Sequence, residues 1–219
     1  MIVCLEGPSA VGKTTLAAAL ASRAGAAVVP ELVADASPPI AASAAWFVER
    51  HAERWQRARA LADAAPLVVL DGDPFKGLWY HWTFADEGWS GVDVVAPLHR
   101  AQLAQGALAF PDLYVVLTAS AAELRARRAG DPTRTRRHHE KHLRLIEPQR
   151  RYFTALGAAA PGRVLWPDTS VRERLVDEVL AAIARLPHDR PDDGRVLDHV
   201  VDWLRARGPV DGSPDAPPT

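Results

Sequence analysis

The chain has 219 residues, of which 48% are hydrophobic and 24% are charged, and its net charge is −1. This length is enough for one domain whose core needs neither disulfides nor a structural metal, and the composition excludes a chain that is disordered throughout. The near-zero net charge provides no global positive field for nucleic acid or an anionic membrane, so any electrostatic recognition must be local. Three of the 26 basic residues are lysines, namely Lys13, Lys76 and Lys141.

The cysteine count and the hydropathy pattern both favour a reducing cytoplasm. Cys4 is the single cysteine, which excludes a disulfide framework and a zinc site built on two or more cysteines. The first apolar stretch ends at Glu6 and is too short for a signal peptide, and no run of 18 apolar residues follows it. We therefore expect a soluble, cytoplasmic protein that binds neither nucleic acid nor membrane, and a homodimer stays open.

Short apolar runs alternate with longer amphipathic stretches along the chain. The runs predict five strands, at residues 2–5, 26–29, 67–70, 113–117 and 163–166. Continuous apolar runs suit parallel strands that are covered on both faces. Over residues 42–63, apolar residues recur at steps of three and four, which predicts an amphipathic helix. The alternation favours an α/β fold with a doubly wound, five-stranded parallel sheet.

Composition also suggests where this domain ends. We expect the sheet and its helices to occupy residues 1–186. Residues 187–207 then form a polar, Pro-rich linker and a last amphipathic helix. Residues 208–219 are rich in Pro, Gly and Asp, which predicts a disordered tail.

The most specific motif is a complete G-x-x-x-x-G-K-T directly after the first predicted strand. Its glycines let the loop turn successive backbone N–H groups toward one anion, and the following helix adds the positive end of its dipole. Lys13 would reach the terminal phosphates of a nucleotide, and the Thr14 hydroxyl would bind Mg²⁺. A structural glycine-rich turn is the alternative, but the strand-loop-helix context favours nucleotide binding. The residues expected to contact the nucleotide are Gly7, Ser9, Ala10, Val11, Gly12, Lys13, Thr14 and Thr15.

Carboxylates follow the second and third predicted strands, at the edge where open α/β sheets bind ligands. Asp71 and Asp73 come after the third strand and are candidates to hold Mg²⁺ through water. Glu31 comes after the second strand and could accept the proton of an attacking hydroxyl. Acidic residues are also common after strands as turn formers and helix caps, and this alternative stays open for all three.

Positive charge is concentrated after the fourth predicted strand. Residues 125–151 hold ten Arg or Lys residues against three acidic ones, a local charge of +7. Such a segment can neutralise a migrating phosphoryl group, and the Gly-Asp-Pro sequence at 130–132 suggests that residues 125–151 form a mobile lid. A solvated helical face is one alternative. A nucleic-acid patch is another, although no aromatic residues interleave with the arginines.

Aromatic residues gather between residues 46 and 89, which hold five of the seven tryptophans. We expect most of them to pack in the core. A flat ligand pocket would use a few for stacking, and the pattern alone does not identify which.

Residues 1–20, MIVCLEGPSAVGKTTLAAAL, resemble the opening of P-loop small-molecule kinases, especially the deoxynucleoside kinase and thymidylate kinase group. The resemblance implies the P-loop kinase fold with a helical lid, and it implies ATP and Mg²⁺ as cofactors. It also implies that Glu31 is the general base and that Arg125 and Arg128 are the lid arginines. The family carries an arginine after the acidic residue that ends the third strand, whereas Asp71-Gly72-Asp73 lacks it. Antibiotic phosphotransferases of the same fold are a further resemblance.

We therefore predict an ATP-dependent kinase that transfers the γ-phosphoryl group to a hydroxyl of a nucleoside-like or antibiotic-like molecule. A nucleotide kinase is one alternative, because its acceptor is already a phosphate and needs no general base. A regulatory P-loop NTPase is an alternative of another class, although the chain lacks a guanine-specifying Asn-Lys-x-Asp. The predicted catalytic residues are Lys13, Glu31, Arg125 and Arg128, and the predicted metal ligands are Thr14, Asp71 and Asp73.

Overall fold

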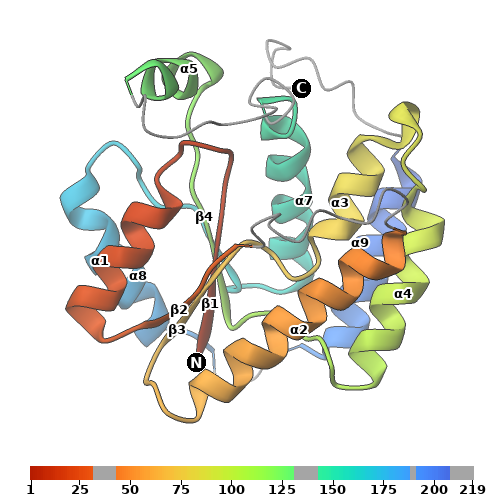
Figure 1. The fold of residues 1–219 in the computed structure, drawn as a ribbon, viewed down its shortest axis with the longest axis horizontal. Helices are drawn as coiled ribbons and strands as arrows, with labels where there is room; N and C mark the ends of the chain where they lie inside the picture. The colour runs from red at the N-terminus through yellow and green to blue at the C-terminus, as the bar shows by residue number, and fades with distance from the viewer. Residues whose placement is uncertain (32–42, 131–142, 188–190, 208–219) are drawn as a thin grey trace.

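The structure is a computed structural model that describes residues 1–31, 43–130, 143–187 and 191–207. Its five strands form one parallel sheet in the order β2-β3-β1-β4-β5, covered by helices on both faces (Figure 1). The doubly wound parallel sheet predicted from the apolar runs is thus confirmed. The strands are β1 (Ile2–Glu6), β2 (Ala27–Val29), β3 (Val68–Asp71), β4 (Leu113–Val116) and β5 (Val164–Leu165).

The central strands supply two separate cores, one on each face of the sheet. Cys4 and Tyr114 belong to one core, whereas Val3, Leu5 and Val115 belong to the other. Successive side chains of a strand point to opposite faces, so a strand covered on both sides must be apolar at every position. This explains the uninterrupted apolar runs.

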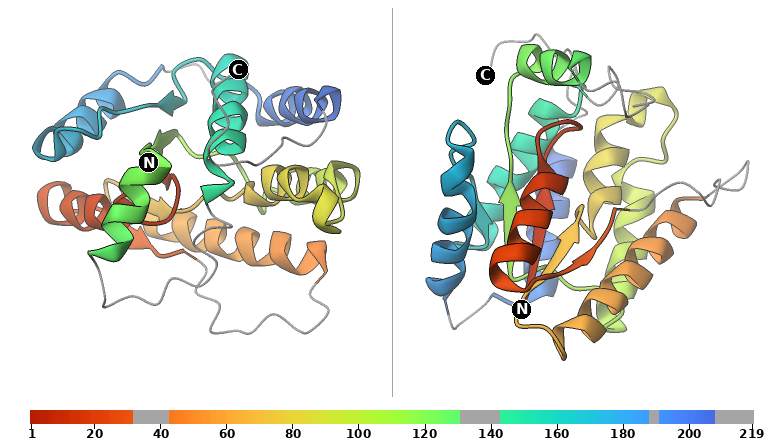
Figure 2. Two further views of the ribbon diagram at one scale, coloured as in Figure 1. Left: turned by 90° about the horizontal axis from the view of Figure 1, so that it is seen from above. Right: turned by 60° about the vertical axis from the view of Figure 1, so that its left-hand side comes forward.

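The helices divide unequally between the two faces (Figures 1 and 2). One face carries α1 (Lys13–Ala24) and α8 (Arg172–Ala184). The other carries α2 (Ala44–Ala62), α3 (Lys76–Thr83), α4 (Val92–Ala104), α7 (Ile146–Ala159) and α9 (Asp193–Ala206), with a 3-10 turn (Ala85–Glu87) after α3. Helix α5 (Ala121–Ala129) lies beyond the carboxyl ends of the strands (Figure 2). None of the helices in the described ranges has both the length and the apolar character needed to span a bilayer.

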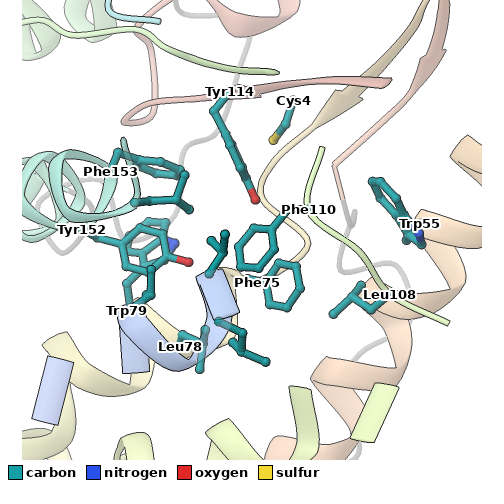
Figure 3. Packing of buried hydrophobic residues seen from close by; sticks show 14 of the residues in the cluster. Cys4, Trp55, Phe75, Leu78, Trp79, Leu108, Phe110, Tyr114, Tyr152 and Phe153 are labelled. Atoms are coloured by element: carbon teal, nitrogen blue, oxygen red, sulfur yellow. The ribbon is translucent and has the colours of Figure 1, made fainter. Parts of the chain in front are cut away.

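Aromatic rings fill the core on the crowded face of the sheet (Figure 3). Phe75 stacks on Phe110 with ring centroids 4.0 Å apart, and Tyr114 lies 5.1 Å from Phe153. Trp79 of α3 is buried against α7, and its ring centroid lies 6.2 Å from that of Tyr152. Much of the aromatic cluster of residues 46–89 therefore packs in the core, as expected.

The last helix, α9, is part of this same core. Its apolar stripe of Val196, Leu197, Val200, Val201 and Leu204 is buried, and α9 packs against α4 and α7. At its first turn, the Asp193 carboxylate accepts hydrogen bonds from the Phe110 N–H at 3.0 Å and from Arg163 at 2.6 Å. The helix predicted within residues 187–207 thus completes the main domain, whereas the predicted tail at 208–219 lies outside the described residues.

Replacing the buried Leu197 by alanine should therefore destabilise the whole domain. The cavity left in the shared core predicts a loss of about 2–5 kcal/mol in the free energy of unfolding. His199, exposed on the same helix, is the matched control, and His199→Ala should change that free energy by less than about 0.5 kcal/mol. Urea denaturation measures both variants, and equal values would show that α9 does not contribute to the core.

Candidate active site

The loop between β1 and α1 has the backbone geometry of a phosphate-binding loop. Gly7 and Gly12 have φ angles of +139° and +116°, and Ala10 has a φ of +73°, a conformation that side chains rarely adopt. Gly12 caps α1 without a side chain, so the first backbone N–H groups of this helix face the loop. Backbone donors and the positive end of the helix dipole make such a terminus an anion site.

Lys13 stands at the first position of α1 and folds over the loop. Its Nζ donates to the Gly7 carbonyl at 2.6 Å, which holds the ammonium above the residues that would cradle a phosphate. The loop borders a cavity of about 910 Å³, within the usual range for a small-molecule site. All the predicted nucleotide contacts line this cavity: Gly7, Ser9, Ala10, Val11, Gly12, Lys13, Thr14 and Thr15.

The cavity extends to both sides of the phosphate loop. On the side of β4 and β5, here called the β5 end, its wall is mainly apolar. The residues of the β5 end are Leu117, Thr169, Leu175 and Val176. On the side of β2 and β3, here called the β3 end, the wall is charged and aromatic. The residues of the β3 end are Glu31, Asp71, Lys76, Trp79, Tyr80 and Gln149.

Glu31 lies two residues past β2, at the β3 end of the cavity. Its Oε1 accepts a hydrogen bond from Lys76 Nζ at 2.8 Å, and its side chain is 48% exposed. The Lys76 charge is the main cause that lowers the pKa of Glu31 to about 2, against the opposing effect of burial. The carboxylate is therefore ionised at neutral pH and can accept a proton from a bound hydroxyl.

Asp71 ends β3 beside Leu5 of β1 and also lines the cavity. Burial raises the pKa of its carboxyl group, while the Lys13 charge acts in the opposite direction. Its Oδ1 is buried and has no hydrogen-bond donor among the described residues. A carboxylate oxygen without a partner, beside an anion site and the exposed Thr14, fits the oxygen ligands that Mg²⁺ prefers.

Asp73, the other predicted metal ligand, belongs to the core. Its side chain is fully buried and is not among the residues that line the cavity. Its Oδ1 accepts hydrogen bonds from the Phe75 N–H and the Tyr114 hydroxyl, and its Oδ2 accepts one from Trp79 Nε1. Burial raises the pKa of this carboxyl group to about 7. Because donors occupy both oxygens, the prediction of a metal ligand at Asp73 is corrected to a structural role.

Glu6, which the sequence analysis did not single out, connects the phosphate loop to its surroundings. This buried residue ends β1, and its Oε2 accepts hydrogen bonds from the Gly7 N–H at 2.9 Å and from Gln149 Nε2 at 2.7 Å. Its Oε1 accepts one from the Asp73 N–H at 2.8 Å and lies 3.1 Å from Lys76 Nζ. The signal in the sequence is a charged residue at the end of an otherwise apolar strand.

Arg54 of α2 holds the ends of two strands together and was also missed. Its guanidinium donates to the carbonyl of Pro30, at 3.1 Å, and to the carbonyl of Asp71. These contacts fix the backbone next to Glu31 and at Asp71. Helix α2 thus contributes one charged residue to the site.

Arg127 is the arginine of α5 that reaches the phosphate loop. Its guanidinium donates to the Val11 carbonyl at 3.2 Å, and it lines the cavity. The predicted lid arginines, Arg125 and Arg128, are exposed and are not among the lining residues. The capping box of Ser120 and Glu123 sets where α5 begins, and with this start Arg127 faces the loop.

The predicted lid over residues 125–151 divides into parts with different positions. Residues 131–142, which contain several of its basic residues, lie outside the described residues. Residues 146–151 form the first turns of α7, in which Gln149 is buried and Tyr152 and Phe153 enter the core. Helix α7 is therefore part of the core and, through Gln149, of the cavity wall, and does not belong to a lid.

Comparison with known families and structures agrees with this geometry. The profile of a family described as an AAA domain matches residues 2–156, more than half of the chain. The chain belongs to this AAA-domain family. No protein of curated function matches it significantly. Strand β5 and helices α8 and α9 lie beyond the matched region.

Solved structures with a similar fold include a deoxyadenosine kinase and a thymidylate kinase. The deoxyadenosine kinase from M. mycoides with bound dATP has 10% identity and a TM-score of 0.58, over 84% of this chain and 100% of that chain. The complex of this kinase with the products dCMP and dCDP has 11% identity and a TM-score of 0.62, over 84% of this chain and 99% of that chain. The thymidylate kinase from Candida albicans has 16% identity and a TM-score of 0.57, over 88% of this chain and 95% of that chain. These likenesses show that the chain has the fold of the deoxynucleoside and thymidylate kinases, as its first 20 residues indicated.

The close packing around Gly7 predicts that alanine at this position disrupts the phosphate loop. A Cβ there would lie 2.5 Å from the Leu117 carbonyl oxygen and 2.9 Å from Val11 Cγ1, so the loop would have to move. Gly7→Ala should therefore abolish measurable ATP binding in calorimetry. Gly106 is the matched control, because its φ is also positive, at +67°, but its Cβ would meet no atom within 4 Å. Gly106→Ala should cost about 1–2 kcal/mol of stability and leave ATP affinity unchanged, and equal effects on binding would contradict this account.

Proposed function

We propose that the chain is an ATP- and Mg²⁺-dependent kinase that transfers the γ-phosphoryl group to a hydroxyl of an uncharged small molecule. The position of Glu31 carries this proposal. Its carboxylate is ionised, is half exposed, and lines the same cavity as the phosphate loop. A hydroxyl acceptor needs such a base, whereas hydrolysis by a regulatory switch requires no chamber for an acceptor.

The residues of the loop and of the β5 end suit a nucleoside triphosphate. The loop N–H groups and Lys13 would hold the phosphates, and Arg127 would add positive charge beside Val11. The mainly apolar β5 end offers a surface for the base of the nucleotide. Thr14 and Asp71 would hold Mg²⁺, which, when bound, neutralises charge that develops on the phosphate oxygens.

The groups of the β3 end can carry out the proton transfer. Glu31 accepts the hydroxyl proton while the hydroxyl oxygen forms its bond to the γ-phosphorus and the bond from that phosphorus to the β,γ-bridging oxygen breaks. ADP leaves with this oxygen, and the half-exposed Glu31 can release its proton to water. Because the Lys76 charge lowers the pKa of Glu31 to about 2, the Glu31 carboxylate is deprotonated over the whole neutral pH range.

Charge at the β3 end favours an uncharged acceptor over a nucleoside monophosphate. Glu31 and Asp71 both line it, and Lys76, the cation among its described lining residues, is already paired with Glu31 and Glu6. A phosphate group placed here would meet two carboxylates. The partly exposed Tyr80 gives the same wall an aromatic surface, with the buried Trp79 packed against it, which suits a ring-bearing acceptor of the nucleoside-like or antibiotic-like kind.

The substitution Glu31→Gln keeps the shape of the side chain and removes the base. It should lower kcat by about 10²–10⁴-fold and leave the dissociation constant of ATP nearly unchanged. Candidate nucleosides, nucleotides and hydroxylated antibiotics are first screened by mass spectrometry for the gain of one phosphoryl group, and kinetics follow on the acceptor found. Glu49→Gln, on an exposed position of α2, is the control and should behave as wild type.

Three outcomes would contradict the proposal. Near-normal turnover of Glu31→Gln would remove its role as general base. Transfer to nucleoside monophosphates alone would favour the nucleotide kinase. ATP hydrolysis that is indifferent to every acceptor would favour the regulatory NTPase.

A further inference from the structure

Lys76 lies where three parts of the active site meet. It is the first residue of α3, and its side chain is only 14% exposed. Its Nζ lies 2.8 Å from Glu31 Oε1 and 3.1 Å from Glu6 Oε1, and 5.7 Å from the centre of the Tyr80 ring. One ammonium group therefore joins the end of β1, the segment after β2 and the start of α3.

Hydrogen bonds hold the Glu6 carboxylate in place. Three N–H donors hold the Glu6 carboxylate, and one of them is the backbone N–H of Gly7. An ammonium paired with Glu6 is thus fixed relative to the first residue of the phosphate loop. The Glu31 end differs, because a half-exposed carboxylate that follows a three-residue strand would otherwise sample several rotamers.

Gly72 makes room for the pair. Its φ is +96°, and a Cβ at this position would lie 3.3 Å from Lys76 Nζ and 3.6 Å from Glu31 Oε1. A side chain here would crowd the ammonium and come into van der Waals contact with the carboxylate. The turn after β3 therefore brings the backbone of Gly72 against the contact between Lys76 and Glu31.

We infer that Lys76 is a positioning residue for phosphoryl transfer, which links Glu31 to Glu6 and so holds the general base in register with the phosphate loop. The inference rests on the function proposed above. Lys76 acts through Glu31 and needs no contact with the nucleotide. Charged and titratable groups face Glu31 from several elements: Lys76 from α3, Lys13 from the start of α1, Arg54 and His51 from α2, and Asp71 from β3.

The first test is a titration that requires no turnover. The carboxyl carbon of Glu31 is followed by NMR, with Glu31→Gln used to assign its signal. Lys76→Gln removes the charge but keeps an N–H donor for Glu6, and it should raise the pKa of Glu31 from about 2 toward the usual value of about 4.3. Lys76→Arg should keep the pKa low, and Lys76→Met, a second neutral variant, should act like Lys76→Gln.

The second test is kinetic and separates orientation from base strength. A higher pKa alone would make Glu31 a stronger base, so a fall in kcat reports lost orientation. Lys76→Gln should lower kcat by about 10- to 100-fold, with little change in the dissociation constant of ATP, and Lys76→Arg should restore most of the rate. Arg100→Met removes one positive charge from an exposed ion pair between α4 and α9 and should change neither quantity.

A double-mutant cycle shows whether Lys76 acts through Glu31. If it does, Lys76→Gln should have almost no further effect on kcat in the Glu31→Gln background, because contacting residues that act as one unit are not additive. Effects that multiply, an unchanged pKa of Glu31, or a parallel loss of ATP affinity would each overturn the inference. A normal rate in Lys76→Gln would overturn the inference and leave the proposed function standing. A wild-type chain that phosphorylates no acceptor would overturn the proposed function, and the titration would still test the pairing of Lys76 with Glu31.

Discussion

The buried carboxylate of Glu6 is the interaction on which the site depends. A charge taken out of water at the end of a central strand is tolerated only where it is paired and hydrogen-bonded. Glu6 meets this condition with three N–H donors and the Lys76 ammonium. These partners come from the phosphate loop, the turn after β3, α7 and α3. One carboxylate therefore fixes the relative positions of three regions of the sequence: the phosphate loop at Gly7, residues 73–76, and α7 at Gln149.

The rest of the site follows from strand ends that meet at one edge. In a parallel sheet ordered β2-β3-β1-β4-β5, the carboxyl ends of β1, β2 and β3 are neighbours, so the phosphate loop, Glu31 and Asp71 border one cavity. Arg54 secures this edge from α2 through two backbone carbonyls. Helix α9 lies beyond the region matched by the AAA-domain family, yet it packs behind α3 and so supports the wall that carries Lys76, Trp79 and Tyr80.

Sequence reasoning identified the parts of this molecule that local pattern determines. Apolar runs located the five strands because both faces of a parallel sheet are buried, and the phosphate loop is a contiguous motif. Asp71 and Asp73 could not be separated, because the turn at Gly72 sends one carboxylate to the cavity and the other into the core. The pairing of Lys76 with Glu6 and Glu31 joins residues 70 and 45 positions apart, for which the sequence offers no periodic signal. Arg127 lies in the predicted basic segment, but the sequence did not distinguish it from Arg125 and Arg128, because the rotation of α5 depends on where its capping box starts the helix.

The central claim is that the phosphate loop, the metal ligands and the general base all act on the same transferred phosphoryl group. A crystal structure of the chain with Mg²⁺ and a non-hydrolysable ATP analogue tests this most directly. The account predicts the γ-phosphate beside Lys13, with the ion held by Thr14 and Asp71. It also predicts the Glu31 carboxylate, still paired with Lys76, facing that phosphate across the space for an acceptor. A nucleotide whose γ-phosphate is remote from Glu31, or a Lys76 that has left both carboxylates for the nucleotide, would contradict it.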